Sequence, residues 1–345
     1  MMDYDIFELG NVTLQSGEVL PDAFLAFKTY GTLNRDKSNV VVYPTAFGDT
    51  HKNNEWLIGS GKALDPEKYF IIVPNLLGNG LSSSPSNTSP PFDREHFPHV
   101  TIYDNVTLQH RLVTEKFGIK TIALVVGWSM GGIQSFQWGA SYPDMVERIA
   151  PFDGAAKTWP HTYVVLDGMK AALMGAVGFD SSKLNQLTSD DMRAVGRVYA
   201  GWGVSQAFYR EERYQELGFD SLEDFVAGVW EKSFMEMDSH NVLAMLWTGQ
   251  FADISENPTY NGDFDEALGG IKALACMMPG STDLFCRADD NAYEANHMPN
   301  AVLNPIESIW GHFAGRGINS TDNKWIDDNL KRLLQMYKRI DLHSN

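Results

Sequence analysis

The chain has 345 residues, 43% of them hydrophobic and 21% charged, which is typical of a globular protein with a large core. Its 44 acidic residues outnumber 27 basic ones, and the net charge of −17 argues against nucleic acid or an anionic membrane surface as a partner because a negative field repels phosphates. Two cysteines are too few for a disulfide framework or a four-cysteine zinc site, and no leader-like segment or long apolar run is present, so we expect a cytoplasmic protein.

Short β-branched runs alternate with longer helical patterns along most of the chain. We predict strands at residues 22–31, 40–46, 69–76, 121–129, 146–154, 273–280 and 301–308. We predict helices at residues 111–119, 129–142 and 323–337. This alternation predicts an α/β fold with a mainly parallel sheet.

The segment 157–266 departs from this alternation because it contains few β-branched runs, many helical patterns, and numerous Met and Trp residues. We interpret it as a helical lid that is inserted between two strands and covers the C-terminal edge of the sheet, where open α/β sheets bind their ligands. The predicted organisation is therefore one core, residues 1–156 and 267–345, with one inserted lid.

One motif, Gly127-Trp128-Ser129-Met130-Gly131, lies where a buried apolar run changes to a helical pattern. A G-x-S-x-G pattern in a strand-to-helix turn is typical of a strained nucleophile turn, in which small flanking residues let the serine project at the head of the helix. The backbone N–H of Met130 points to the same side and is expected to stabilise a developing oxyanion. The motif therefore predicts Ser129 as a nucleophile.

A serine hydroxyl also needs a histidine that takes its proton and a carboxylate that orients the histidine. After a nucleophile turn of this type, the carboxylate precedes the histidine in the chain. Asp283, in the loop just past the predicted strand 273–280, is the candidate acid. Asp289 and Asp290 are rivals, but they lie deeper in the next helical pattern.

The candidate base is His312, which follows the predicted strand 301–308. Its competitor His297 precedes that strand and would lie at the wrong end of the sheet. Because Ser129, Asp283 and His312 each follow a predicted strand, we expect all three at one edge of the sheet, as a catalytic triad.

The second oxyanion donor is expected in the loop after an earlier strand. Ala46 is the best candidate by position, with Phe47 as the alternative, and Gly48 lets the backbone approach closely.

Metal and nucleotide chemistry have little support in the sequence. No H-E-x-x-H motif occurs, and the pair His96 and His99 lacks a clear third ligand. The glycines Gly78 and Gly80 are not followed by the G-K-[ST] ending of a phosphate loop. We therefore expect no cofactor and no metal.

These motifs and their surroundings resemble the homoserine acetyltransferase family of α/β hydrolases. The matching stretches are LIGSGKALDPEKYFIIVPNLLGNG (57–80), FPHVTIYDNV (97–106), FGIKTIALVVGWSMGGIQSFQWGASYPDMVERI (117–149), STDLF and GHF. The resemblance implies an α/β-hydrolase fold, a triad of Ser129, Asp283 and His312, an oxyanion hole formed by Ala46 and Met130, and a homodimer through the helical lid.

The chain departs from the family pattern where the transferases bind their amino-acid substrate. The arginine and tyrosine that hold the homoserine carboxylate fall on Met235 or Glu236 and on Val242 here. Phe313 replaces the aspartate that follows the catalytic histidine, and Trp128 replaces a glycine of the nucleophile turn. A zwitterion in this pocket would lose its hydration without gaining partners, at a cost of several kcal/mol.

The leading hypothesis is a serine carboxylesterase for small uncharged esters with short acyl groups, with Phe47, Trp128, Phe313 and Met235 in an apolar substrate pocket. The alternative is homoserine O-acetyltransferase or a related acyl-CoA-dependent O-acyltransferase. Coenzyme A phosphates favour basic surroundings, but residues 157–266 hold 8 Lys or Arg and 18 Asp or Glu, a net charge of −10. A non-catalytic binding protein is a third hypothesis, and its expected mark, a missing triad member, is not found.

Overall fold

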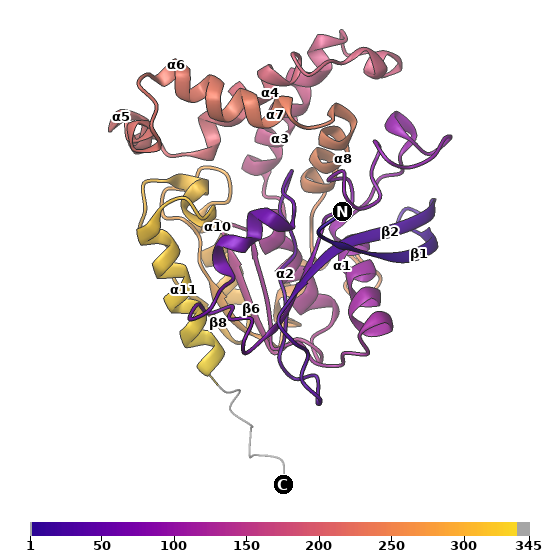
Figure 1. Cartoon of the computed structure of the whole chain (residues 1–345), viewed down its shortest axis with the longest axis vertical. Helices are drawn as coiled ribbons and strands as arrows, with labels where there is room; N and C mark the ends of the chain where they lie inside the picture. The colour runs from indigo at the N-terminus through magenta and orange to yellow at the C-terminus, as the bar shows by residue number, and fades with distance from the viewer. Residues whose placement is uncertain (1, 337–345) are drawn as a thin grey trace.

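The computed structural model describes residues 2–336, and eight strands among them form one sheet in the order β1-β2-β4-β3-β5-β6-β7-β8 (Figure 1). The strands are β1 (Asp5–Thr13), β2 (Val19–Tyr30), β3 (Val40–Val42), β4 (Phe70–Pro74), β5 (Leu124–Trp128), β6 (Arg148–Phe152), β7 (Leu274–Met277) and β8 (Ala301–Leu303). β2 pairs antiparallel with both of its neighbours, β1 and β4, and the remaining five pairs of neighbours are parallel, so the sheet is mainly parallel as predicted. Residues 1 and 337–345, including the end of predicted helix 323–337, lie outside the described residues.

Alternate side chains of the central strands belong to two separate apolar clusters. In β3, Val40 and Val42 pack in one cluster with residues of α1 (Ile102–Arg111) and α2 (Met130–Ser141), whereas Val41 packs in the other with residues of α11 (Ser320–Gln335). This two-sided burial explains why the central strands are continuous apolar runs. Two further helices, α9 (Phe264–Gly269) and α10 (Ala288–His297), flank β7 and β8 in the chain.

Several element boundaries differ from the prediction. The helix expected at 111–119 begins earlier, at Ile102, because Thr101 caps it: the Thr101 hydroxyl accepts the N–H of Asp104 and the Asp104 carboxylate accepts the N–H of Thr101. β1 escaped prediction because it is an exposed edge strand with register shifts around Gly10, which weaken the alternation.

Between β6 and β7 the chain is almost entirely helical, and Figure 1 shows these helices gathered at one end of the sheet. The helices are α3 (Pro160–Ala176), α4 (Met192–Gly203), α5 (Gln206–Arg210), α6 (Leu222–Phe225), α7 (Lys232–Met235) and α8 (Ser239–Gln250), with a π-helical turn at Val226–Glu231 and 3-10 turns at Ser181–Gln186 and Arg213–Leu217. No helix within residues 2–336 is both long and apolar enough to cross a membrane.

The two ends of this helical segment run side by side in a short neck. Lys157 and Asp253 form an antiparallel bridge. The N–H of Thr158 donates to the carbonyl of Ala252 at 2.8 Å, and the N–H of Ile254 donates to the carbonyl of Ala156 at 3.2 Å. The chain therefore enters and leaves the helical segment at one place, beside the core.

Candidate active site

The nucleophile turn links β5 to α2, and Ser129 sits at its apex with φ 53° and ψ −122°. This left-handed conformation is strained for a serine and is tolerated because neighbouring contacts fix it. A Cβ at Gly127 would lie 2.2 Å from the carbonyl carbon of Gly131, and a Cβ at Gly131 would lie 2.7 Å from the carbonyl oxygen of Pro44. Both flanking glycines are therefore required, as the motif predicted.

Ser129, Asp283 and His312 are brought together at the C-terminal edge of the sheet. The Nε2 atom of His312 lies 2.8 Å from Ser129 Oγ, and its Nδ1 atom lies 2.8 Å from Asp283 Oδ2. With the proton on Nδ1, that N–H donates to the carboxylate, and Nε2 accepts the serine hydroxyl. The chain of hydrogen bonds therefore leads from a carboxylate to the serine oxygen.

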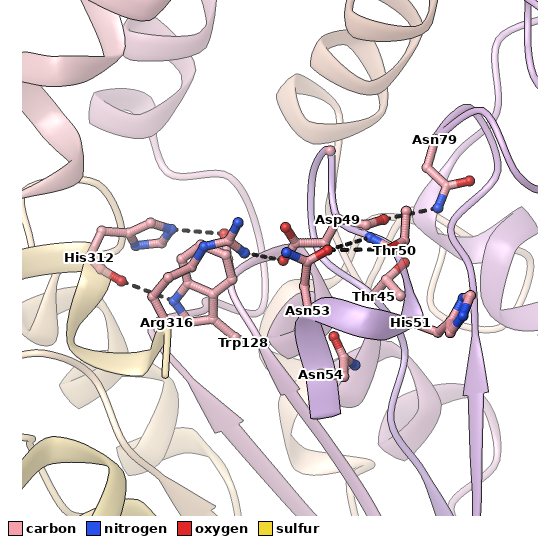
Figure 2. A network of polar contacts seen from close by, with 12 residues as sticks. Thr45, Asp49, Thr50, His51, Asn53, Asn54, Asn79, Trp128, His312 and Arg316 are labelled. Carbon is pink, nitrogen blue, oxygen red and sulfur yellow. Dashed lines mark hydrogen bonds and ion pairs between the residues drawn. The ribbon is translucent and has the colours of Figure 1, made fainter. Parts of the chain in front are cut away.

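Asp283 and His312 each make further hydrogen bonds that hold them in place. The Oδ1 atom of Asp283 accepts the backbone N–H groups of Phe285 at 2.7 Å and Cys286 at 3.1 Å. The indole N–H of Trp128 donates to the carbonyl of His312 at 2.9 Å (Figure 2). Because Trp128 immediately precedes Ser129, this bond connects the turn between β5 and α2 directly to the backbone of His312.

The predicted oxyanion donors lie on neighbouring segments. Met130 is the first residue of α2, where a backbone N–H has no acceptor within the helix. The loop containing Ala46 is fastened to this helix, because the Gln134 side chain donates to the carbonyls of both Thr45 and Met130. Gly48, with φ 69°, lets the same loop turn beneath Met237.

A buried carboxyl group, that of Asp153, bonds the backbone near both Asp283 and His312. Asp153 follows β6, and its side chain is fully buried. Its Oδ1 atom accepts the N–H of Gly280 at 2.6 Å, and its Oδ2 atom accepts the N–H of Gly315 at 2.7 Å. Burial, together with the charge of Asp283, raises the pKa of Asp153 well above its usual range. Asp153 thus joins the loop that contains Asp283 to the turn that contains His312.

A cavity of about 270 Å³ opens beside Ser129 and Met130. Three of the four residues predicted for the substrate pocket, namely Phe47, Trp128 and Phe313, line it. Met235 is absent from its described lining, and its neighbours Phe234 and Met237 take that place. Most other lining side chains are apolar: Ile133, Leu166, Met169, Val229, Trp230 and Phe285.

An ion pair between a buried carboxylate and a partly exposed guanidinium borders this cavity. Arg316 Nη1 donates to the carboxylate of Asp49, and the guanidinium lies over the Trp128 ring with its central carbon 4.6 Å from the ring centroid (Figure 2). Burial raises the pKa of Asp49, and the partner Arg316 opposes that shift. The pair ties the loop of Ala46 to the turn of His312.

The remaining candidate residues lie elsewhere. His297 ends α10 and bonds the carbonyl of Tyr293, and Asp289 and Asp290 occupy the first turn of that helix. Val242, which takes the tyrosine position of the transferases, is completely buried in the helical segment.

Within residues 2–336, one group of three side chains has metal-ligand atoms close together: Asp283, Cys286 and His312, all within 4.8 Å of one another. Two of these side chains already share a hydrogen bond, and burial raises the pKa of the Cys286 thiol well above its usual range. A protonated thiol is a poor metal ligand, so this group fits a metal badly.

The sequence did not predict Asp49, Tyr199 and Arg316, which line the cavity, or Asp153, which bonds Gly280 and Gly315. A weak signal existed for Asp153, because it lies near the end of the predicted strand 146–154 and directly follows β6 in the structure.

Comparison with known proteins places this geometry in context. Residues 39–173 match the family model described as the α/β hydrolase fold. The chain is 38% identical over 327 residues to an ethyl acetate hydrolase of Pseudomonas veronii, covering 94% of this chain and 92% of the relative. A solved acetylester hydrolase from Corynebacterium glutamicum superposes with a TM-score of 0.91 at 36% identity and 96% coverage of both chains. A homoserine O-acetyltransferase of Methanohalobium evestigatum is 42% identical over 335 residues, covering 87% of this chain and 67% of the relative. The predicted α/β-hydrolase fold is confirmed.

Proposed function

Because the chain belongs to the homoserine O-acetyltransferase-like family of α/β hydrolases, we propose that it is an esterase-type member, a serine carboxylesterase for small uncharged acetate-type esters. The observation that carries this proposal is the unbroken hydrogen-bonded chain from Asp283 through His312 to Ser129, placed beside an apolar cavity. The similar ethyl acetate hydrolase and acetylester hydrolase support the choice of ester.

In the first half of the reaction, the Ser129 oxygen attacks the ester carbonyl while His312 Nε2 takes the hydroxyl proton. The negative charge that develops on the carbonyl oxygen is stabilised by the backbone N–H groups of Ala46 and Met130. Asp283 holds Nδ1 protonated and stabilises the imidazolium. His312 then gives its proton to the leaving alcohol, and an acyl-serine remains.

In the second half, His312 takes a proton from water, and the resulting hydroxide attacks the acyl-serine. Collapse of the second oxyanion releases the carboxylic acid and returns the proton to Ser129. Water is the acceptor in this proposal because Phe313 replaces the aspartate that the transferase pattern has after the histidine, and Asp49 already neutralises Arg316, so an amino-acid zwitterion would gain little in this largely apolar cavity.

Ser129→Ala tests this assignment in an assay of ethyl acetate and p-nitrophenyl acetate hydrolysis. We expect kcat to fall roughly 10⁴-fold or more because the nucleophile is lost. Ser135→Ala is the matched control, because Ser135 lies in the same helix and its hydroxyl only bonds the carbonyl of Gly131. Equal hydrolysis by Ser129→Ala and the wild type would refute the assignment.

Acyl transfer is the competing outcome. Thiol release from acetyl-CoA, measured with and without homoserine, is expected to remain slow under both conditions. The acidic helical segment supports this expectation, since it carries a net charge of −10 and repels phosphates. Thiol release that depends on homoserine and exceeds ester hydrolysis would favour a transferase.

We also propose that residues 157–266 form a lid and that the chain forms a homodimer through it. Exposed apolar side chains on α3 and at the end of α8 support this, namely Tyr163, Val164 and Phe251. Light scattering after size exclusion should give a dimer mass for the wild type and a monomer mass for Val164→Asp. A wild-type monomer would refute the proposal.

We further propose a cytoplasmic location, without nucleic-acid or membrane partners. The two cysteines are free and buried, which suits a reducing compartment.

A further inference from the structure

Several side chains that line the cavity beside Ser129, Trp230 and Lys157 among them, have hydrogen-bond donors without an acceptor among the described residues, and two of these side chains are close to the proposed path of the ester. They are Arg316, on the turn that follows His312, and Tyr199, on α4 of the helical segment. Neither takes part in the proposed chemistry, and both are surrounded by aromatic rings. A few polar groups placed in a mostly apolar cavity are what orients a ligand that enters it.

The guanidinium of Arg316 is only partly occupied. Among the described residues, its side-chain bond goes from Nη1 to the Asp49 carboxylate, which leaves the N–H groups of Nε and Nη2 without an acceptor. Stacking on Trp128 fixes the plane of the guanidinium (Figure 2), and its side chain keeps 26% of its surface accessible. The free donors therefore occupy a defined position beside the catalytic groups.

Tyr199 supplies the second donor from α4 of the helical segment. Its ring packs edge-on against Trp230, Phe234 and Phe285 at centroid distances of 5.4, 5.8 and 5.9 Å. The hydroxyl makes no hydrogen bond to any residue in the described range. Tyr199 and Arg316 line the same cavity, where burial raises the pKa of Tyr199 and the charge of Arg316 acts against that shift.

The charge balance indicates which kind of ligand group accepts hydrogen bonds from these donors. Asp49 already neutralises Arg316, so an added carboxylate would face the Asp49 charge and would gain little from the pair. Lys157 also lines the cavity, but its ammonium lies over the Trp159 and Phe264 rings at 4.6 and 3.9 Å. A neutral oxygen gains hydrogen bonds here without importing a charge.

The position of the donors indicates which part of the ester carries that oxygen. His312 must protonate the leaving alcohol, so the alcohol portion lies on the histidine side of the cavity. Arg316 is four residues from His312 and stacks on Trp128, whose indole holds the His312 carbonyl. We infer, building on the proposed esterase function, that Arg316 and Tyr199 bind a second, uncharged oxygen in the alcohol portion, so that preferred substrates are short-acyl esters of alcohols carrying an ether, keto or hydroxyl oxygen.

Two esters of equal size test this inference. In 2-methoxyethyl acetate one ether oxygen replaces a methylene group of butyl acetate, so the ratio of their kcat/KM values measures recognition of that oxygen. Comparing this ratio between variants cancels the difference in intrinsic reactivity. We expect the wild type to favour the methoxy ester and Tyr199→Phe to reduce the preference roughly three- to tenfold, as the loss of one neutral hydrogen bond implies.

A second variant and a control complete the experiment. Arg316→Met combined with Asp49→Asn removes the donors without leaving a buried unpaired carboxylate, and it should lower the preference roughly tenfold or more. Tyr209→Phe is the control, because the Tyr209 hydroxyl bonds the Ala200 carbonyl and Tyr209 does not line the cavity. It should keep the wild-type ratio.

The outcomes separate this inference from the function on which it rests. If butyl acetate is hydrolysed and the ratio is the same in wild type, Tyr199→Phe and the double variant, the inference is overturned while the esterase function stands. If the wild type hydrolyses neither ester, the esterase function fails and the inference falls with it.

Discussion

Asp153→Ala removes the one carboxyl group that joins the acid-bearing loop to the histidine-bearing turn. The variant leaves the N–H groups of Gly280 and Gly315 without acceptors in a site that excludes solvent. Each unsatisfied buried donor costs about 1–3 kcal/mol, so the free energy of unfolding should fall by roughly 2–6 kcal/mol. That is a large share of the roughly 5–15 kcal/mol by which domains are stable.

Urea denaturation followed by circular dichroism measures this loss, with an unchanged m value as evidence that the two-state transition persists. Because Asp153 does not line the cavity, kcat of the folded variant should fall while KM stays near the wild-type value. Asp104→Ala is the matched control: Asp104 also accepts two backbone N–H groups, from Gln15 at 2.8 Å and Thr101 at 2.9 Å, on α1.

The control should therefore lose comparable stability and keep its kcat. A loss below about 1 kcal/mol for Asp153→Ala would refute the assignment of both buried bonds, since one unsatisfied donor alone costs that much. An equal fall of kcat in both variants would show that general destabilisation, and not the position of Asp153, causes the effect.

The other predictions concern packing and titration. A Cβ at Gly315 would lie 2.5 Å from Trp128 Cδ1, whereas a Cβ at Gly175 on α3 meets nothing within 4 Å. Gly315→Ala should therefore lower the melting temperature and the activity, and Gly175→Ala should add about 0.5–1 kcal/mol of stability; a similar thermal shift for both would contradict the packing argument. Burial raises the pKa of Glu294 from 4.5 to about 8, so the folded chain keeps a proton that the unfolded chain releases between these values. Stability should fall as pH rises through this window, by at most about 1.4 kcal/mol per pH unit, and Glu294→Gln should flatten the dependence measured by urea denaturation.

The sequence was informative where function depends on local pattern. The turn at Ser129 needs glycines within two residues on either side, and the structure brings Asp283 and His312 to it from loops that follow β7 and β8. Each of these residues could be predicted because a residue of the required type follows an apolar strand pattern within a few positions.

Contacts between distant segments were not predictable in the same way. Asp49 and Arg316 are 267 positions apart, and nothing near either residue marks the other as its partner. Met235 illustrates a different cause. It is expected in the pocket because the arginine of the family pattern falls on Met235 or Glu236, and such an alignment does not tell which side chains of α7 face the cavity. In the structure Phe234 and Met237 line it.

The neck formed by Lys157 and Asp253 makes the helical segment exchangeable. Paired backbone positions in an antiparallel bridge lie about 5 Å apart, a span that a two-residue hairpin turn closes. A chain could therefore lose, replace or lengthen everything between Thr158 and Ala252 without rerouting a single strand of the sheet. The lining residues that the helical segment contributes to the cavity therefore lie in one contiguous stretch of sequence. Replacement of that stretch can change the ester preference without changing Ser129, Asp283 or His312.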